Sequence, residues 1–561
     1  MGRHIRWQAI ITFTGIALTL AFLGFLSFSR QTISLPDTDG TYREGIAGAP
    51  QLINPLLAQY NQVDQDLTSL IFEGLTRSNG EGGVEPVLAE SWQVSNDGLA
   101  YLFKLRRDVR WQDNEPFQAD DVIFTIGLMQ DPDFPGVPYL GELWRTVTVQ
   151  KLDDYTVRFI LPEPFPAFVD FTTIGLLPQH LLADISASDL LNHPFNLDPI
   201  GTGPYQVDRV TAQFVRLSIN PVYHETKPRL TEVEFRFYPT YQETIAAYQA
   251  GEIDSISYIP PQAIPTVQNL NTLNLYSARM SGYTVIYLNL RHPEETPFFA
   301  QPSLRQALMF ALDRPALINQ ALNGQGMIAT GPIRAWNWAY NPNQPLLSFD
   351  QAKARGMLEA DGWFDRDQDG IRDKDDRPFS FTLLTSDDPD KIAVAEMIKA
   401  QWQQIGINIT LDVVGAGLSE RLNQHNFEAA LVDIRLSGDP DPYPLWHETQ
   451  IDNGQNYGGW NNDQASLLLE TARTITNTGR RNDFYYEFQD IFAEEVPALI
   501  LFYPVYTFGV SEEVFNVQVG PMSNSSDRFR TMPDWYKMTR RVIYSESQFD
   551  DEVVPERAPP P

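Results

Sequence analysis

Residues 85–126 read "EPVLAESWQVSNDGLAYLFKLRRDVRWQDNEPFQADDVIFTI", and they contain the patterns of a strand and a helix in succession. Apolar and polar side chains alternate over residues 100–111, which is typical of a half-buried strand. Asp120 and Asp121 stand where a helix would begin, and carboxylates there accept bonds from free backbone N–H groups. The helix pattern over residues 119–131 places four apolar side chains on one face: Val122, Ile123, Ile126 and Met129.

Strand and helix patterns continue to alternate outside this stretch, which predicts an α/β fold. Strand patterns occupy residues 155–161 and 427–436, and helix patterns occupy residues 302–322 and 348–363. In the last of these, Ser348 and Gln351 have capping-box spacing, and Gly362 is expected to end the helix. Gly201, Gly203 and Pro204 in "GTGPYQV" predict a sharp turn with a constrained φ before a strand that begins at Tyr205.

The bulk composition excludes several classes of protein. A chain of 561 residues is too long for one ordinary core, and 43% hydrophobic residues indicate a folded body. Its formal net charge of −31 disfavours nucleic acid and anionic membrane as partners of that body. It contains no cysteine, so disulfides, thiolate metal sites, a cysteine nucleophile and a lipid anchor on cysteine are all excluded.

The N-terminus carries an apolar segment. Arg3, His4 and Arg6 precede an uncharged run from Trp7 to Ser29, which is long enough to cross a bilayer. The positive charges predict that this end stays in the cytoplasm and that the body is exported. We expect an uncleaved membrane anchor, and the alternative is a signal peptide cleaved after the small-x-small sequence at 27–29.

The segments quoted above resemble, in order, the family 5 bacterial extracellular solute-binding proteins, the peptide- and nickel-type binding components of ABC importers. The likeness rests on residues 85–126 and 201–207 and on further segments over about 460 residues. Those segments are "INPLLA" (53–58), "LIFEGLTR" (70–77), "YQAGEIDSI" (248–256), "PFFAQPSLRQALMFALDRPAL" (297–317), "GDPDPYPLWHE" (438–448) and "RRNDFYYEFQDIFAEEVPALILFY" (480–503).

This resemblance implies the two-lobed periplasmic-binding-protein fold, type II, of the large subclass with an extra inserted domain. The implied function is to enclose a solute between two closing lobes and to deliver it to a membrane permease. The expected organisation is a signal anchor at 1–30, a tether at 31–40, lobe I in three parts (41–77, 176–283 and 506–545), a small inserted domain at 78–175, lobe II at 284–505 and a disordered tail at 546–561.

The resemblance also bears on how a peptide would be held. Peptide-binding members pair an aspartate with the free amino group of the peptide, a few residues before the Asp-Pro motif that is Asp439-Pro440 here. That position falls on Leu436, which cannot neutralise an ammonium ion. The departure puts oligopeptide binding in doubt, unless the alignment slips by one residue or the nearby Asp433 takes the role. A sugar, an opine or a metal chelate is then the alternative to an oligopeptide.

Large aromatic residues in loops are the preferred ligand contacts. Trp338 and Asn337 lie in the proline-bounded loop "RAWNWAYNP" (334–342), and Trp446 follows the Asp-Pro motif. Such side chains stack on flat solutes while Asn337 and Asp439 fix orientation. Ordinary loop packing is the competing interpretation. The predicted ligand-binding set is Trp338, Trp446, Asp439, Asn337, Asn54 and Tyr283.

An acidic loop within residues 363–381 has the spacing of a calcium loop. Counted from Asp365, acids occupy positions 1, 3, 5, 9 and 12, with Gly370 at position 6: Asp365, Asp367, Asp369, Asp373 and Asp376. A strand pattern follows the loop instead of a second helix, and the twelfth residue is not the usual glutamate. The two hypotheses are a structural calcium site and a solvated hairpin-like turn. No other cofactor is expected.

We expect a monomeric binding protein. We do not expect an enzyme, because neither G-x-S-x-G nor H-E-x-x-H occurs in the sequence. Its expected partners are a small solute or peptide and the subunits of an ABC permease, and its expected place is the periplasmic or extracellular side of the membrane. The alternative function is a membrane-tethered solute sensor or an envelope chaperone that uses the same fold without transport.

Overall fold

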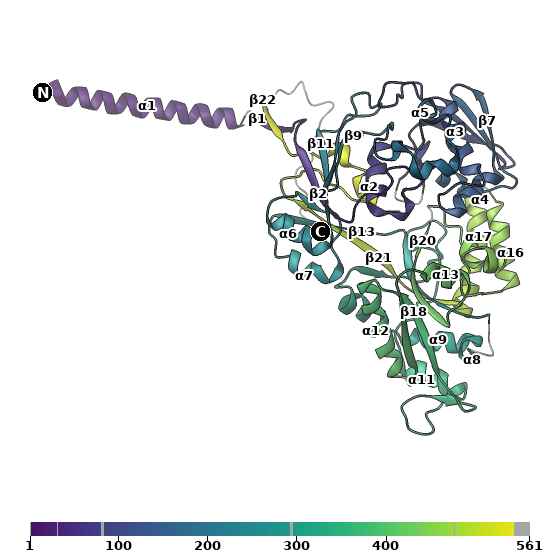
Figure 1. Cartoon of the computed structure of the whole chain (residues 1–561). Coiled ribbons are helices and arrows are strands. Elements are labelled where there is room, and N and C mark those ends of the chain that lie inside the picture. The colour runs from purple at the N-terminus through teal and green to yellow at the C-terminus, as the bar shows by residue number, and fades with distance from the viewer. Residues whose placement is uncertain are drawn as a thin grey trace.

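A large mixed sheet runs through the body in this computed structural model (Figure 1). The structure describes residues 2–30, 32–79, 83–291, 296–436, 438–475 and 477–543, so the predicted tail at 546–561 lies outside the described residues. The main sheet contains β2 (Thr41–Ala47), β9 (Tyr205–Val210), β10 (Phe214–Ile219), β11 (Glu232–Tyr238), β12 (Ser255–Ile256), β13 (Leu273–Arg279), β14 (Gly282–Leu288), β15 (Gly326–Ile328), β18 (Ser380–Ser386), β19 (Asn408–Val414), β20 (Ala429–Arg435) and β21 (Ala498–Ser511).

The long strand β21 divides this sheet into two halves. Its first half pairs with β14 and β15, and its second half pairs with β12 and β13. We call the half with β2 and β9–β13 lobe I, and the half with β14, β15 and β18–β20 lobe II. The chain passes between the lobes at the β13–β14 connection and again in the middle of β21. These two neighbouring crossings form a hinge about which the lobes can close.

A separate antiparallel sheet and its helices form a small domain beside lobe I. Its strands have the order β5-β6-β8-β7, and β6 (Ala100–Leu105) and α3 (Ala119–Gln130) confirm the strand and helix predicted from the opening stretch. Asp121 caps α3 by accepting a bond from the Gln118 N–H at 2.9 Å. The other elements are β5 (Ala89–Val94), β7 (Thr148–Asp153), β8 (Thr156–Ile160), α4 (Pro138–Thr146) and the 3-10 segment η2 (Pro166–Thr173).

Helices cover both faces of the lobe II sheet, and the buried strand β14 explains why. Val285 and Tyr287 point into one apolar cluster, whereas Ile286 and Leu288 point into the cluster on the opposite face. One face is covered by α9 (Pro302–Phe310), α11 (Gln351–Ala360) and α12 (Pro389–Gln403). The other face is covered by α14 (Tyr443–Trp446), α16 (Asp463–Arg473) and α17 (Thr478–Glu495).

Two predicted helices differ from the structure in detail. The helix predicted over 302–322 is interrupted after Phe310, because Asp313 caps a new turn at the Ala316 N–H (2.9 Å) and Pro315 lacks an N–H. It continues as α10 (Arg314–Ala316) and a π-helical turn, Leu317–Ala321. The helix predicted over 348–363 starts later, because Asp350 caps α11 in place of the predicted Ser348 box, and it ends before Gly362 as expected.

The remaining elements are short. Lobe I carries α2 (Gln62–Ile71), α6 (Tyr241–Gln249) and α7 (Ile264–Val267), and the two-stranded pairs are β1 (Thr32–Pro36) with β22 (Thr539–Ile543), β3 (Thr76–Ser78) with β4 (Val84–Pro86), and β16 (Asp373–Lys374) with β17 (Arg377–Pro378). Further short helices are α5 (Gln179–Leu182), α8 (Pro297–Ala300), α13 (Leu418–Asn423) and α15 (Gln450–Asn453).

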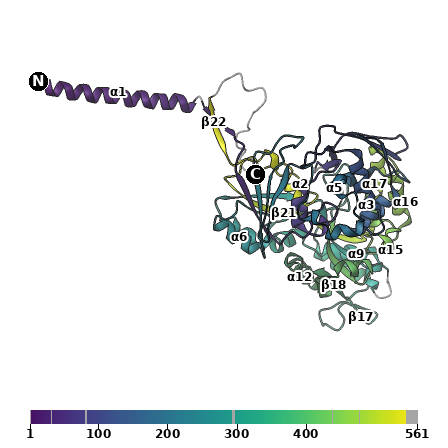
Figure 2. The ribbon, with the colours of Figure 1, turned by 45° about the horizontal axis from the view of Figure 1, so that its top comes forward.

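The N-terminal helix α1 (Gly2–Arg30) extends away from the body in both ribbon views (Figures 1 and 2). In the part of the chain that the structure describes, no helix has the length and apolar character needed to cross a membrane. The membrane anchor at 1–30 stays a prediction.

The glycines of "GTGPYQV" are required by close backbone contacts. Neither Gly201 nor Gly203 has a positive φ, and β9 begins at Tyr205 as predicted. A Cβ on Gly201 would collide with the carbonyl oxygen of Ile71 at the end of α2, and one on Gly203 would lie 2.6 Å from the Leu70 carbonyl oxygen. The Gly203 N–H also donates to the Ile71 carbonyl at 2.8 Å.

Gly201→Ala is therefore expected to lower the free energy of unfolding by about 1–3 kcal/mol, because backbone must move to admit the methyl group. The control is Gly356→Ala on the exposed face of α11, where nothing lies within 4 Å of the added Cβ. That change should stabilise the protein by about 0.5–1 kcal/mol. Urea denaturation of both variants provides the measurement. Equal stability of the two would contradict the close packing at Gly201.

Candidate ligand-binding site

A cavity of about 520 Å³ opens where lobe I, the small domain and lobe II meet. This volume lies within the range of pockets that hold small molecules. Lobe I contributes α2, residues 72–77 and residues 523–533, and the small domain contributes Tyr139, Leu140 and residues 170–175. Leu436 and Gly438, which follow β20 in lobe II, complete the wall. Because these parts lie on both sides of the hinge, a solute in the cavity contacts elements that move relative to one another.

A carboxylate in the lobe I wall is held by two neighbours. Glu73 accepts a hydrogen bond from the Tyr223 hydroxyl at 3.1 Å, and the Nε2 atom of buried His224 lies 2.9 Å from its other oxygen. Burial and the nearby Glu73 charge raise the pKa of Tyr223, so its hydroxyl remains a donor. The pair therefore presents an ordered polar group to the cavity.

The arginines that line the cavity already pair with carboxylates. Arg77 contacts Glu85 at 2.6 Å and Glu225 at 3.0 Å, and Arg530 lies 3.5 Å from Asp527. Burial raises the pKa of Asp527, while Arg530 and the N–H groups of residues 523 and 524 act in the opposite direction. These pairs make the wall polar while neutralising most of its charge.

A hydrogen bond joins the small domain to lobe II at the cavity wall. The backbone N–H of Asp439 donates to the Asp170 carboxylate at 2.7 Å. Burial raises the pKa of Asp170 to about 6 and outweighs the opposing effects of the Asp439 and Gly438 backbone groups and of Arg334. Since Asp170 lies in η2 and Asp439 follows β20, this contact holds the two parts together in the structure.

Arginines brace the lobe II loop that makes this contact. Arg481 forms two hydrogen bonds with the Asp439 carboxylate, at 2.6 and 2.7 Å. Arg334 donates to the Gly438 carbonyl at 2.8 Å, and Arg473 lies 3.2 Å from Asp441. The loop therefore presents its backbone N–H groups to Asp170 from a rigid frame.

Comparison with known proteins identifies the architecture. A family model described as "Bacterial extracellular solute-binding proteins, family 5 Middle" matches residues 83–456. The oligopeptide-binding protein AppA of Bacillus subtilis is 30% identical over 490 residues, which cover 85% of this chain and 89% of AppA. The chain belongs to the family 5 bacterial extracellular solute-binding proteins. The dipeptide-binding protein of Escherichia coli is 27% identical over 507 residues, which cover 85% of this chain and 91% of that protein.

A solved structure of a family 5 protein has the same fold. The structure of AppA from Bacillus subtilis in complex with a nonapeptide has a TM-score of 0.73 and 29% identity, and it covers 90% of this chain and 100% of that one. The two-lobed α/β fold and the family assignment predicted from the sequence are thereby confirmed. The predicted domain boundaries stay predictions.

Two of the predicted ligand-binding residues lie in the core of lobe II. Trp446 is 1% exposed, and its ring lies 4.8 Å from that of Phe492 and 5.7 Å from that of Tyr287. Tyr283 on β14 is fully buried in the same apolar cluster. Neither lines the cavity of this family 5 protein, and their contacts are those of core residues.

The other predicted ligand contacts lie outside the cavity lining as well. Trp338 is 39% exposed, with the Arg481 guanidinium 5.5 Å from its ring, and Asn337 is buried and accepts a bond from the Ala339 N–H. Asn54 is buried and donates to Asn196 at 3.0 Å, next to the cavity residue Pro55. Asp439 touches the cavity indirectly, through Asp170.

Leu436 lines the cavity, so the position that the family resemblance singled out does face the site. Asp433, which was the alternative partner for an amino group, lies 2.8 Å from Lys391 and accepts a bond from Thr284. It is absent from the cavity lining. Among the described residues, the carboxylates that face the cavity are instead Glu73, Asp170 and Asp527.

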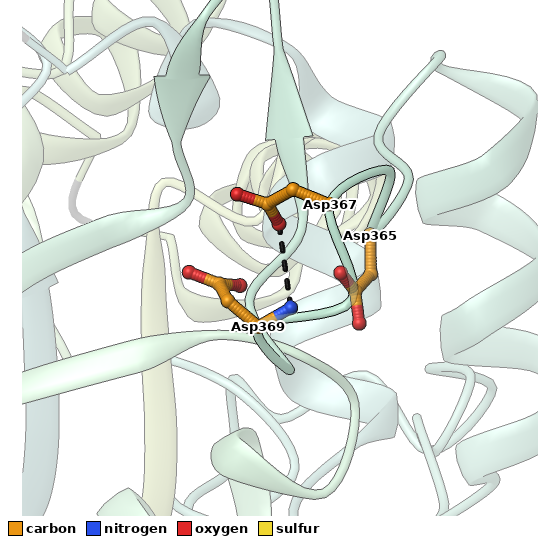
Figure 3. A group of neighbouring side chains, drawn as sticks. All are labelled: Asp365, Asp367 and Asp369. Atoms are coloured by element: carbon orange, nitrogen blue, oxygen red, sulfur yellow. Dashed lines mark hydrogen bonds between the residues drawn. The ribbon is translucent and has the colours of Figure 1, made fainter.

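The acidic loop brings three of its five predicted ligands together (Figure 3). Ligand oxygens of Asp365, Asp367 and Asp369 lie within 4.8 Å of one another, and all three residues are exposed. Backbone N–H groups of the loop bond to them, including that of Asp369 to Asp367 at 3.3 Å. Asp373 instead lies 3.3 Å from Arg366, and Asp376 is exposed in the β16–β17 turn with φ 59°. The calcium site stays a prediction.

The sequence analysis missed the charged cavity residues, because they come from distant parts of the chain. Glu73 meets a histidine 151 residues away, and Asp170 meets an amide 269 residues away. One local signal was present, since Asn524 and Asp527 have the spacing of a capping box, which the structure contains at the start of a 3-10 turn. The other residues carry no short motif.

Proposed function

We propose that this chain is the solute-binding component of an ABC importer, that it encloses a peptide-like solute between its lobes, and that it delivers the solute to a membrane permease. The observation that carries this proposal is the cavity, whose wall combines lobe I, the small domain and lobe II at the hinge. Family membership supports the transport role, and relatives named for oligopeptide and dipeptide binding support the solute class.

We further propose that the protein acts without catalysis, as an exported monomer whose partners are a small solute or peptide and an ABC permease. The extracellular description of the family supports export. A relative described as a peptide transport periplasmic protein favours transport over the alternative of a sensor or chaperone. Solute binding then stabilises the closed lobes, and the closed form is the signal that the permease recognises.

No cofactor takes part in the proposed binding. A structural calcium ion at Asp365, Asp367 and Asp369 is a separate proposal, supported by the proximity of their oxygens. It is tested by native mass spectrometry in about 1 mM calcium, since extracellular calcium modules bind at about that concentration. One chelator-sensitive calcium adduct that Asp367→Asn removes would support it. An unchanged mass would contradict it.

Leu436→Trp is expected to weaken binding of a random hexapeptide mixture by about tenfold or more, because the indole would occupy cavity volume that the solute needs. Leu467→Trp, on the exposed face of α16, is the matched control and should bind as the wild type does. Isothermal titration of the full-length proteins measures the difference. Equal affinity in both variants would show that peptides bind elsewhere.

A further inference from the structure

Asp170 lies in the cavity wall beside the loop that carries Leu436, the position at which the family resemblance implies an aspartate. It lines the cavity together with Leu436 and Gly438 of lobe II. A Cβ placed on Gly438 would lie 3.0 Å from the nearer carboxylate oxygen of Asp170, so the two residues are in direct proximity. Leu436 therefore offers no carboxylate from the lobe II side of the cavity, whereas Asp170 offers one from the small-domain side.

The Asp170 carboxylate retains the capacity to accept further hydrogen bonds. It accepts the Asp439 N–H at 2.7 Å and is influenced by the Gly438 amide, whereas an ionised carboxylate offers roughly four acceptor positions. The nearby arginines bind other groups: Arg481 binds the Asp439 carboxylate, and Arg334 donates to the Gly438 carbonyl and to Ser281. A ligand cation would therefore meet a carboxylate that can still accept it.

The other two cavity carboxylates are more fully engaged. Glu73 accepts from Tyr223 and contacts His224, and Asp527 accepts from the N–H groups of residues 523 and 524 and lies near Arg530. Burial raises the pKa of Asp170 to about 6. A protonated amine placed beside it would favour the charged form of the carboxylate.

We propose that Asp170 receives a protonated primary amine of the solute, and so replaces the carboxylate that position 436 lacks. This inference rests on the proposed function and specifies its solute class as amine-bearing, such as a peptide with a free N-terminus. The same carboxylate accepts an N–H from the lobe II loop. Amine binding and lobe closure therefore strengthen each other through one side chain.

The test compares random lysine-free hexapeptides that have free N-termini with the same mixture after N-acetylation, by titration of the full-length protein. Acetylation should weaken binding to the wild type by about tenfold or more. Asp170→Asn should bind the free peptides about tenfold more weakly than the wild type and should no longer distinguish the two mixtures. Asp198→Asn, at an exposed position outside the cavity lining, is the control and should behave as the wild type does.

A second readout needs no variant. Free peptides should bind the wild type more weakly as the pH is lowered through about 6, because protons compete with the ammonium group for Asp170. The peptide amine, with a pKa of about 7.7–8.0, stays charged over this interval. Acetylated peptides should lack this dependence. Equal affinity for both mixtures would overturn the role of Asp170 while leaving peptide binding intact, whereas binding of neither mixture would overturn both proposals.

Discussion

Arg528→Met is expected to lower the free energy of unfolding by about 3–5 kcal/mol, the usual cost of leaving buried charges unpaired. Arg528 is fully buried, and so are its partners Glu44 and Asp66. Its guanidinium lies 2.5 Å from Glu44 and 2.6 Å from Asp66, and it also donates to the Ser525 carbonyl. Methionine fills similar space but leaves both carboxylates without their cation.

The pH dependence of this loss provides a second check. Burial raises the pKa of Glu44 even with the arginine present, and removing the cation would raise it further. An acid whose folded pKa lies above its unfolded pKa destabilises the protein at high pH, and the penalty disappears as the pH falls and the group becomes protonated. The variant should therefore lose more stability at about pH 8 than at about pH 5.

Thermal or urea denaturation measures both effects, with Arg106→Met as the matched control. Arg106 pairs with Asp108 at 2.8 Å on the surface, where removal of such a pair costs about 0–1 kcal/mol. If Arg528→Met and Arg106→Met were equally stable at neutral pH, the buried network would not hold residues 525–529 against β2 and α2.

Trp446→Ala is expected to destabilise the protein by about 3–5 kcal/mol, because it removes a buried indole from the core of lobe II and leaves a cavity. The side chain packs between Tyr287 and Phe492, with Trp460 near its edge. Trp338→Ala is the comparison, since that side chain is 39% exposed and its loss should cost about 0.5 kcal/mol or less.

The same pair of variants separates a core role from a ligand role. Peptide affinity of folded Trp446→Ala protein should stay within about twofold of the wild-type value, because the indole is outside the cavity lining. A variant with unchanged thermal stability and abolished peptide binding would instead show that Trp446 contacts the solute.

The spacing of apolar residues predicted the strands and helices that bury one face or are buried on both faces. The small domain contains the strand predicted over residues 100–111, although it ends at Leu105, and the helix predicted over 119–131, which ends at Gln130. The predicted helix over 302–322 failed in its middle, because an aspartate cap and Pro315 override the apolar pattern there. At position 201 the glycine did mark a special site. The sequence could not show why glycine is needed there, because the close contact is with Ile71, which lies far away in the chain.

Fewer residues of the candidate site than of the fold could be predicted from the sequence. Trp446 was predicted as a ligand contact because it follows the Asp-Pro motif, but it lies in a core that forms only when α14, α16 and α17 pack together. Leu436 was found because the Asp-Pro motif sets its position, and it does line the cavity. Asp170 could not be found, because its role depends on a contact with residues 438–439 across the two parts of the molecule.

The most direct test of the account is native mass spectrometry of the full-length protein purified from cells, followed by release and sequencing of whatever remains bound. The account predicts a set of adduct masses that fragment as peptides with free amino termini. A single non-peptide compound, or protein that carries no solute and binds no added peptide, would contradict the proposal that this cavity encloses peptides for import.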